Sequence, residues 1–356
     1  MMSTAMASMS VSHYQATRRY LLQHAVSAST AKRYGKAVDA FLRWCDDQGE
    51  DATGVEHLDE LVLEYFHHLY EDGRGKSVAS ATIYGILLRL PQLKWRLHAS
   101  HQCLRAWNKL VPDKSYPPLT WELAVVIAVQ MTRAGYHRYG IGVLLAFDGL
   151  LRVSELCALM TTDIADDGDT RVSTEHKGTL VRIRSSKTGK NQWVKIVDQS
   201  VIDLLRWLLT HHRAQHIMKQ TKVVNNRLSH TTKGRITPSQ KETKKSINDA
   251  RLFPFETYQF RRVFKATCVN LGISERYVPH SLRHGGATRY HHVKGWSIED
   301  VLERGRWASV KSARRYIQSG VAMLMSMAAP VHINKIAIGM ARDPYRHIIT
   351  AYLNSA

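Results

Sequence analysis

The chain has 356 residues, of which 44% are hydrophobic, and this length and composition suit two domains with apolar cores. Its 50 lysines and arginines outnumber its 30 acidic residues, and the formal charge of +20 indicates a nucleic-acid partner, although ribosomal and membrane-surface proteins are also basic. The longest apolar runs, near residues 124–129 and 141–147, are too short to cross a membrane. The four cysteines contain no CxxC pair, so we expect reduced core residues of an intracellular protein and neither a zinc site nor a disulfide framework.

The N-terminal region is basic, because the first 38 residues contain no acidic side chain. A basic, serine-rich start is also typical of a mitochondrial transit peptide. However, apolar residues such as Phe41 and Cys45 continue the pattern of a folded amphipathic helix. We therefore predict a disordered leader over residues 1–11 and, after it, a first helix that contacts DNA.

Helical periodicity indicates a small all-α module over residues 12–110, followed by an extended linker over residues 111–118, where Pro117 and Pro118 prevent helix continuation. The helices of the module are predicted at about 12–26, 30–47, 58–72, 77–94 and 99–110. From residue 119 to residue 320 the chain is again mainly helical, with one small sheet near 171–197. The expected fold is mainly α, with two domains.

Three further segments are predicted in the second half of the chain. The stretches 180–184 and 192–196 alternate as paired strands, and the seven residues between them are predicted as a mobile loop. Residues 211–251 hold ten basic and two acidic side chains, which is usual for a solvated loop and also fits a basic insertion along a DNA backbone. Residues 321–356 begin with a methionine-rich apolar stretch and form a C-terminal tail.

The box from Gly149 to Leu156 places an arginine between two helices. Gly149 is predicted to end an apolar helix, and Ser154 is predicted to cap the next one. Arg152 then falls at the joint, where its guanidinium can reach a phosphate. Taken alone, Arg152 is as well explained as a surface arginine.

A second box begins at Pro279, and a third contains Trp307 and Tyr316. Ser281 is predicted to cap a helix whose N-terminal end favours an anion, with His280 at its mouth and Arg283 one turn inside. In the third box Ser309 is predicted as an N-cap, so that Tyr316 falls about two turns into a short helix. Arginines can clamp a phosphodiester and a phenol can attack its phosphorus.

The order and spacing of these side chains resemble the catalytic set of the tyrosine site-specific recombinases, the integrase family. The residues that carry the resemblance are Arg152, Lys187, His280, Arg283, Trp307 and Tyr316. By this resemblance Tyr316 is the nucleophile, the arginines and Trp307 hold the phosphate, and His280 and Lys187 move protons. The resemblance also implies that Glu155 orients the site from behind, whereas His284 is better explained as a buried histidine that braces its helix.

Two positions in the boxes leave questions open. Lys187 lies in the Ser-Lys-Thr-Gly order of the family's mobile hairpin, and Lys190 competes with it in the same loop. Trp307 occupies a position where many members carry histidine and Cre-like members carry tryptophan. The glycine that usually precedes this position is displaced, because Arg306 intervenes between Gly305 and Trp307.

The resemblance implies a mainly helical two-domain enzyme that acts on double-stranded DNA without a metal or other cofactor. Its family members typically assemble as a homotetramer on two DNA sites, and the C-terminal tail is expected to dock on a neighbouring protomer, with packing on its own domain as the alternative. Two other functions remain open at this point. One is a type IB topoisomerase, which relaxes a single duplex, and the other is a DNA-binding protein that has lost catalysis.

Overall fold

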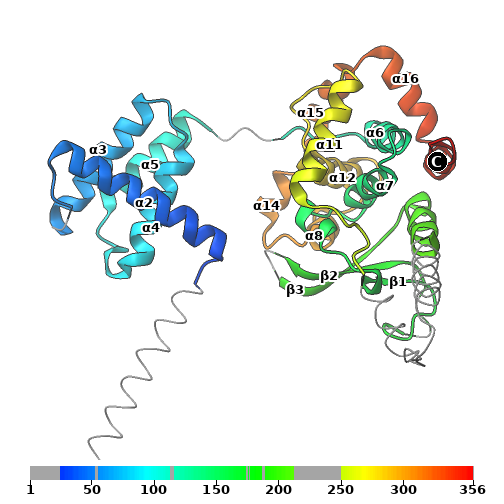
Figure 1. Ribbon diagram of the computed structural model, residues 1–356, viewed down its shortest axis with the longest axis horizontal. Coiled ribbons are helices and arrows are strands. Elements are labelled where there is room, and N and C mark those ends of the chain that lie inside the picture. Colours follow the sequence, from blue (N-terminus) through cyan, green and yellow to red (C-terminus); the bar gives the residue numbers. More distant parts are fainter. Residues whose placement is uncertain are drawn as a thin grey trace, which may run out of the picture. The chain divides into compact units, whose positions relative to one another are not determined.

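The structure is a computed structural model that describes residues 25–52, 55–112, 116–173, 175, 177–186, 189–211 and 250–355. The chain divides into two compact units, residues 1–114 and 115–356, both mainly helical (Figure 1). The predicted leader, nearly all of the first predicted helix at 12–26 and most of the basic segment 211–251 lie outside the described residues.

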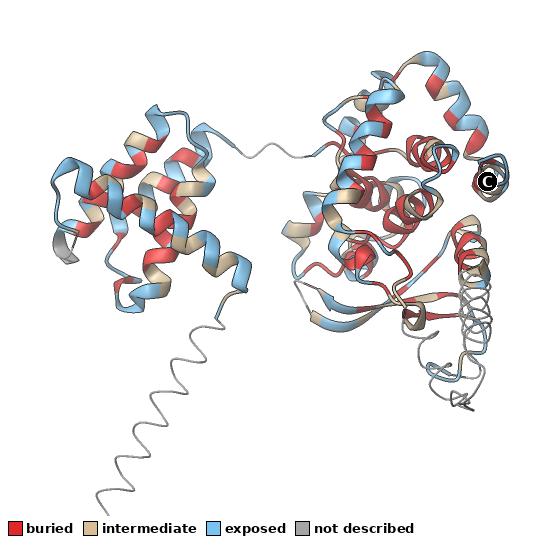
Figure 2. Ribbon diagram, viewed as in Figure 1, coloured by how far each residue is buried: buried red, intermediate tan, exposed pale blue. Residues whose placement is uncertain are grey.

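The helices of the first unit are α2 (Ala28–Gln48), α3 (Val55–Glu71), α4 (Lys76–Arg89), a 3-10 turn η1 (Pro91–Leu93) and α5 (His98–Leu110). Helix α2 begins where the Ser27 hydroxyl accepts a hydrogen bond from the Thr30 amide, and it ends at Gly49 in the left-handed conformation. Helix α4 stops before the predicted end at residue 94, because Pro91 cannot continue it. The buried faces of these helices share one apolar core, and Figure 2 shows their alternation of buried and exposed positions.

The helices of the second unit are α6 (Trp121–Arg133), α7 (His137–Asp148), α8 (Val153–Cys157), the 3-10 turn η2 (Thr161–Asp163), α11 (Thr257–Asn270), α12 (Pro279–His292), α13 (Ile298–Gly305), α14 (Val310–Arg314), α15 (Ser319–Met327), α16 (Val331–Met340) and α17 (Pro344–Leu353), and residues 199–211 are also helical. Helices α6, α7 and α12 are buried along most of their length, as Figure 2 shows. Helix α12 approaches α7 closely, since a Cβ at Gly286 would lie 2.2 Å from the Phe147 carbonyl oxygen. This packing fixes the middle of α12 beside the end of α7.

Within the described residues the strands form one antiparallel sheet in the order β1 (Ile164–Ala165), β2 (Leu180–Ser186), β3 (Gly189–Lys195). The predicted hairpin is confirmed, and its two strands pair from Leu180 with Lys195 to Ser186 with Gly189. The expectation of a seven-residue loop is wrong, because Ser185 and Lys190 are themselves paired in the ladder. Residues 187 and 188, which include Lys187, lie outside the described residues.

Part of the C-terminal tail packs on its own domain, which the sequence analysis left open as the alternative to docking on a neighbouring protomer. Helices α16 and α17 pack on α6 of the same chain, and the core of this unit includes Ile333 and Ala337 from α16 and Ile348 from α17. Burial of these apolar side chains stabilises the unit by about 1.5–3 kcal/mol for each large residue. The first tail helix, α15, is different, because Leu324 and Met327 are 70% and 69% exposed.

The remaining predictions from composition can be compared with the described residues. Cys45, Cys157 and Cys268 are buried free thiols, and Cys103 is partly buried. None of the described helices combines the length and the apolar character that a membrane span requires. No group of three or more potential metal ligands occurs among the described residues.

Candidate active site

Arg152 lies at the joint between α7 and α8, as the first box predicts. Gly149 caps the end of α7, and Leu150 then adopts a left-handed backbone conformation with φ 48°. Such a conformation is unfavourable for a residue with a Cβ, by about 1–2 kcal/mol, and it marks a site that the surrounding structure imposes. The turn carries the chain directly from the buried α7 to Arg152, whose side chain is 21% exposed.

The cap of α8 differs from the prediction, which assigned it to Ser154. The N-cap position is occupied by Arg152, and Glu155 supplies the capping carboxylate. Oε2 of Glu155 accepts the Arg152 amide at 2.9 Å, and Oε1 accepts Nη1 of Arg152 at 2.6 Å. Because Glu155 is only 4% exposed, this buried carboxylate holds both the backbone and the guanidinium of Arg152.

His280 lies in the first turn of α12 and Arg283 one turn further in, as predicted, whereas the prediction that Ser281 caps the helix is wrong. The helix begins at Pro279, two residues before Ser281, because proline is well suited to the first helical position. The Ser281 hydroxyl lies inside the helix and accepts the amide of Val278 at 3.2 Å. Ser281, the third residue of α12, therefore stabilises the first turn through this hydrogen bond.

Arg283 is completely buried, whereas the second box predicts a side chain that reaches a phosphate. Its Nη1 donates to the carbonyl oxygen of Leu150, and its Nη2 donates to that of Gly305. Its guanidinium carbon lies 4.5 Å from the ring centroid of Trp307 and 5.7 Å from that of Tyr316. Two aromatic rings therefore cover the cation in this structure.

Trp307 packs as a buried ring at 6% exposure, and its indole N–H has no hydrogen-bond partner among the described residues. Gly305 makes this packing possible, because a Cβ there would lie 1.9 Å from the indole ring. A buried donor without an acceptor is unfavourable. The indole N–H thus remains available to an acceptor that enters the site.

Tyr316 lies two residues beyond the end of α14, and not within a helix as the third box predicts. Ser309 is the N-cap, as expected, but α14 ends at Arg314. The Tyr316 hydroxyl lies 3.3 Å from Nε2 of His280, and its ring centroid lies 4.3 Å from that of His284 and 4.6 Å from that of Trp307. The phenol is therefore held between two rings with its oxygen beside an imidazole.

His280 and His284, the two histidines in the first half of α12, are neutral near pH 7. Burial, together with the nearby charges of Arg283 and Arg152, lowers the pKa of His280 to about 4. Burial also lowers the pKa of His284 to about 3, assisted by His280 and Arg283. A neutral imidazole at His280 can accept a proton, whereas buried His284 packs against the Tyr316 ring and braces it.

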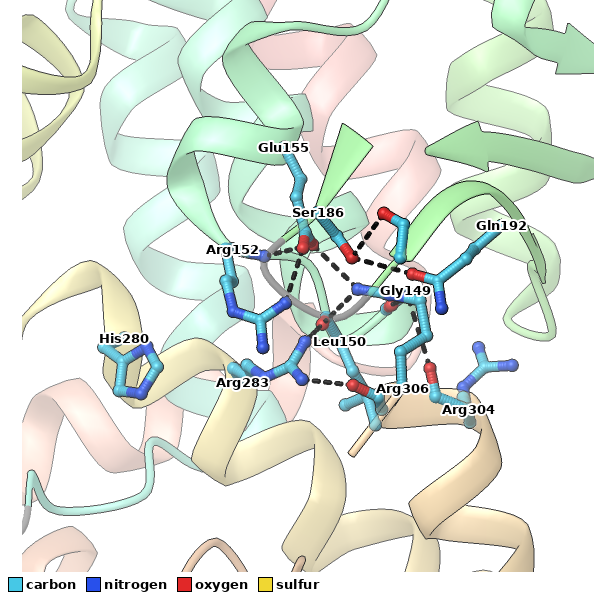
Figure 3. A network of polar contacts seen from close by, with 12 residues as sticks. Gly149, Leu150, Arg152, Glu155, Ser186, Gln192, His280, Arg283, Arg304 and Arg306 are labelled. Atoms are coloured by element: carbon cyan, nitrogen blue, oxygen red, sulfur yellow. Dashed lines mark hydrogen bonds and ion pairs between the residues drawn. The ribbon is translucent and has the colours of Figure 1, made fainter. Parts of the chain in front are cut away.

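The residues of the three boxes converge around Glu155 in Figure 3, where Arg152 and Arg306 approach the carboxylate and Arg283 lies beside them. A cavity of about 730 Å³ opens next to Arg152 and His280. Two basic side chains of α11, Arg261 and Lys265, also line it. Lys265 pairs with Glu275 at 3.3 Å, so the positive charge of the recess comes mainly from Arg152 and Arg261, which suit an anionic group.

Arg306 is the residue whose role sequence reasoning missed, although its displacement of the usual glycine was a visible signal. It ends α13 in the left-handed conformation, with φ 55° and ψ 44°, and its side chain is buried at 7% exposure. Its Nη2 donates to Oε2 of Glu155 at 2.8 Å and to the Leu150 carbonyl oxygen at 3.2 Å. The first and third boxes are thus joined by a buried ion pair.

The chain resembles a known protein family and several solved structures. A family model for the phage integrase family matches residues 126–322. Among curated proteins, none matches the sequence. Among solved structures, the chain is similar to a lambda integrase dimer bound to a COC′ core site, at 15% identity and a TM-score of 0.52 over 87% of this chain and 95% of that one. It is also similar to the Tn1549 transposon integrase in complex with circular intermediate DNA, at 12% identity and a TM-score of 0.51 over 84% of this chain and 98% of that one.

The structural similarities show a shared fold, and the family match covers more than half of the chain. The chain therefore belongs to the phage integrase family of tyrosine recombinases, enzymes that break and rejoin DNA in site-specific recombination.

Proposed function

We propose that this protein cleaves and rejoins DNA strands through a 3′-phosphotyrosine intermediate, with Tyr316 as the nucleophile. The observation that carries the proposal is the 3.3 Å distance between the Tyr316 hydroxyl and Nε2 of His280, beside Arg152 and Arg283. Of the 15 tyrosines in the chain, Tyr316 combines this contact with the expected position in the third box.

In the cleavage step the neutral imidazole of His280 takes the phenolic proton, and the Tyr316 oxygen attacks phosphorus. The bond from phosphorus to the 5′-oxygen breaks, and this leaving oxygen takes a proton from Lys187. The products are a 3′-phosphotyrosyl bond and a free 5′-hydroxyl. The 5′-hydroxyl of a partner strand reverses the step. Because the covalent bond keeps the energy of the phosphodiester, the cycle requires no ATP.

The nonbridging oxygens are assigned to Arg152, Arg283 and Trp307. Arg152 already faces the cavity, and Trp307 has a buried N–H that lacks an acceptor. Arg283 is covered by the rings of Trp307 and Tyr316. Phosphate binding therefore requires that these rings shift from the guanidinium.

The proposal extends to partners and cofactors. DNA is bound by the catalytic unit and by the first unit, which we propose acts as a DNA clamp over residues 12–110, and four protomers assemble on two sites to integrate, excise or invert a DNA segment of a mobile element. Lys187 belongs to the hairpin that approaches the scissile phosphate. Cleavage is expected to continue in excess EDTA, because guanidiniums take the place of a metal clamp. Loss of cleavage in EDTA that Mg²⁺ restores contradicts this mechanism.

The nucleophile is tested with a nicked suicide substrate that traps covalent protein–DNA adducts. The Tyr316→Phe variant is expected to bind DNA and form no adduct, because only the phenolic oxygen is lost. Tyr258→Phe is the matched control, since its ring is 64% exposed on α11 and the adduct is expected to persist. An adduct formed by Tyr316→Phe overturns the assignment. Relaxation of a plasmid without exchange between two sites favours the topoisomerase activity instead.

A further inference from the structure

Arg306 occupies a backbone position that favours glycine, and its side chain is nevertheless buried. Its φ of 55° lies in the left-handed region, where a residue with a Cβ is disfavoured. The guanidinium offsets this disadvantage with several hydrogen bonds. Its acceptors are Glu155, the carbonyl oxygen of Leu150 at 3.2 Å, and more distantly those of Arg304 and Gly149.

Through Glu155, Arg306 shares a carboxylate with Arg152. Oε2 receives Nη2 of Arg306 at 2.8 Å and the Arg152 amide at 2.9 Å, while Oε1 receives the Arg152 guanidinium at 2.6 Å. Figure 3 shows Glu155 between the two arginines. If Arg306 were absent, Oε2 would lose its charged partner in a buried setting, and Arg152 would be drawn toward both oxygens.

Arg306 also acts on the second arginine of the site through the backbone. The Leu150 carbonyl oxygen accepts hydrogen bonds from both Arg306 and Arg283. Leu150 itself is held in the left-handed conformation. One side chain therefore supports the turn before Arg152 and an acceptor of Arg283 at the same time.

The charges around Glu155 leave a positive excess. Arg152, Arg283 and Arg306 face a single carboxylate, while the neighbouring Arg304 is paired with Asp148 at 3.1 Å. Burial alone would raise the pKa of Glu155, but the charge of Arg306 and the hydrogen bonds from Arg152 lower it below its usual value. Glu155 is thus ionised, and two positive charges remain. A phosphodiester gains a second negative charge as the nucleophile attacks, so this excess suits the transition state.

We propose that Arg306 is a positioning residue of the cleavage site, which holds Arg152 through Glu155 and Arg283 through the Leu150 carbonyl group so that both guanidiniums meet the nonbridging oxygens. This inference rests on the proposed function. By this inference Arg306, which stands where family members usually carry glycine, supports the chemical step as well as the turn.

The test measures single-turnover cleavage by the full-length chain with Arg306→Gly and Arg306→Lys. Glycine adopts the left-handed conformation without strain, so the backbone is retained while the contacts are lost. We expect Arg306→Gly to slow cleavage roughly 10- to 100-fold with little change in DNA affinity, since small misplacements of catalytic groups have effects of this size. Arg306→Lys retains the positive charge, so its cleavage rate is expected to fall less than that of Arg306→Gly. Thermal unfolding of each variant is measured in parallel.

A neutral methylphosphonate at the scissile position separates positioning from general damage to the fold. It lacks the charge that the arginines hold, so the defect of Arg306→Gly relative to the unaltered protein is expected to shrink on this substrate. In the Glu155→Gln background, Arg306→Gly is expected to lower the cleavage rate little further, because both changes break the same linkage from Arg306 through Glu155 to Arg152.

The outcomes distinguish this inference from the proposed function. Equal defects on both substrates, or losses that multiply in the double variant, overturn the role of Arg306 while adduct formation by the unaltered protein still supports the cleavage mechanism. Cleavage at an unchanged rate in Arg306→Gly also overturns the role. If the unaltered protein forms no adduct, the proposed function fails, and the inference fails with it.

Discussion

The Tyr316 hydroxyl lies 3.3 Å from Nε2 of His280 in the same chain. The Tyr316 ring is held between His284 and Trp307, and Thr288 donates a hydrogen bond to the Tyr316 carbonyl oxygen at 3.1 Å. Both the side chain and the backbone of this tyrosine are therefore fixed to the unit that carries the arginines.

We predict that each protomer cleaves with its own tyrosine. A mixture of Tyr316→Phe and Arg152→Ala proteins is then expected to give no more adduct than either protein alone, because no protomer contains a complete site. The measurement is adduct formation on a nicked substrate at equal concentrations of the two variants. Adduct restored by mixing shows that a neighbouring protomer donates Tyr316, and this prediction is then wrong.

The buried histidines predict a loss of stability in mild acid. The folded pKa values of His280 and His137 are both lowered to about 4 by burial, from an ordinary value of 6.5. In the unfolded chain these histidines become protonated below pH 6.5, whereas in the folded chain they stay neutral until about pH 4. The free energy of unfolding therefore falls as the pH drops through this window. We estimate a loss of about 2 kcal/mol per histidine between pH 8 and pH 5.

This loss can be measured by urea unfolding at the two pH values. His284→Gln removes one such group, because the pKa of His284 is lowered to about 3. The variant is expected to be less stable at pH 8 but to lose less further stability at pH 5. A pH dependence identical to that of the unaltered protein contradicts the assignment of a neutral buried His284.

The sequence predicted the presence of helices and strands better than the residues at which they begin and end. The hairpin and the joint at Arg152 follow from alternation and from a glycine after an apolar helix, which are local signals. The capping predictions for Ser154 and Ser281 are wrong because other groups compete for the same amides. Glu155 caps α8, and Pro279 starts α12 before Ser281 is reached. Caps depend on which donor a side chain reaches, and spacing alone does not determine this.

Two features of the site depend on tertiary contacts that no local pattern contains. Arg283 is buried under the rings of Trp307 and Tyr316, which approach it from another segment. The ion pair of Arg306 with Glu155 joins residues 151 positions apart. In the sequence, Arg306 is visible only as a departure from the usual glycine. Its function depends on a buried carboxylate that the first box supplies.

The choice between Lys187 and Lys190 leads to a test with a modified leaving group. Lys190 is exposed and pairs with Ser185 in the sheet, so its backbone is fixed in the ladder. If Lys187 is the general acid, Lys187→Ala is expected to slow cleavage by about 10²- to 10⁴-fold. A 5′-bridging phosphorothiolate needs no proton on departure and is expected to restore cleavage. Lys190→Ala is the matched control, and rescue of that variant instead assigns the role to Lys190.

The tail separates into a part that stabilises the chain and a part that is available to a partner. Truncation after Gly320 removes α16 and α17, and it is expected to unfold the second unit, because both helices contribute to its core. Ile348 is fully buried in the shared core, so Ile348→Ala is expected to destabilise the unit by about 2–5 kcal/mol. Urea unfolding of this variant measures the contribution of packing within the chain.

Helix α15 supplies the contrasting variant, because Leu324 and Met327 are 70% and 69% exposed. Exposed apolar side chains of this kind are suited to a groove on another protomer. The double change Leu324→Gln and Met327→Gln is expected to leave unfolding and single-site DNA binding within about 0.5 kcal/mol of the unaltered protein, while synapsis of two DNA sites is lost. The readout is the mass of the protein–DNA complex formed with one and with two sites. Tetramers that still form at normal protein concentration show that α15 is not the contact between protomers, and a large loss of stability shows that its apolar face packs within the chain.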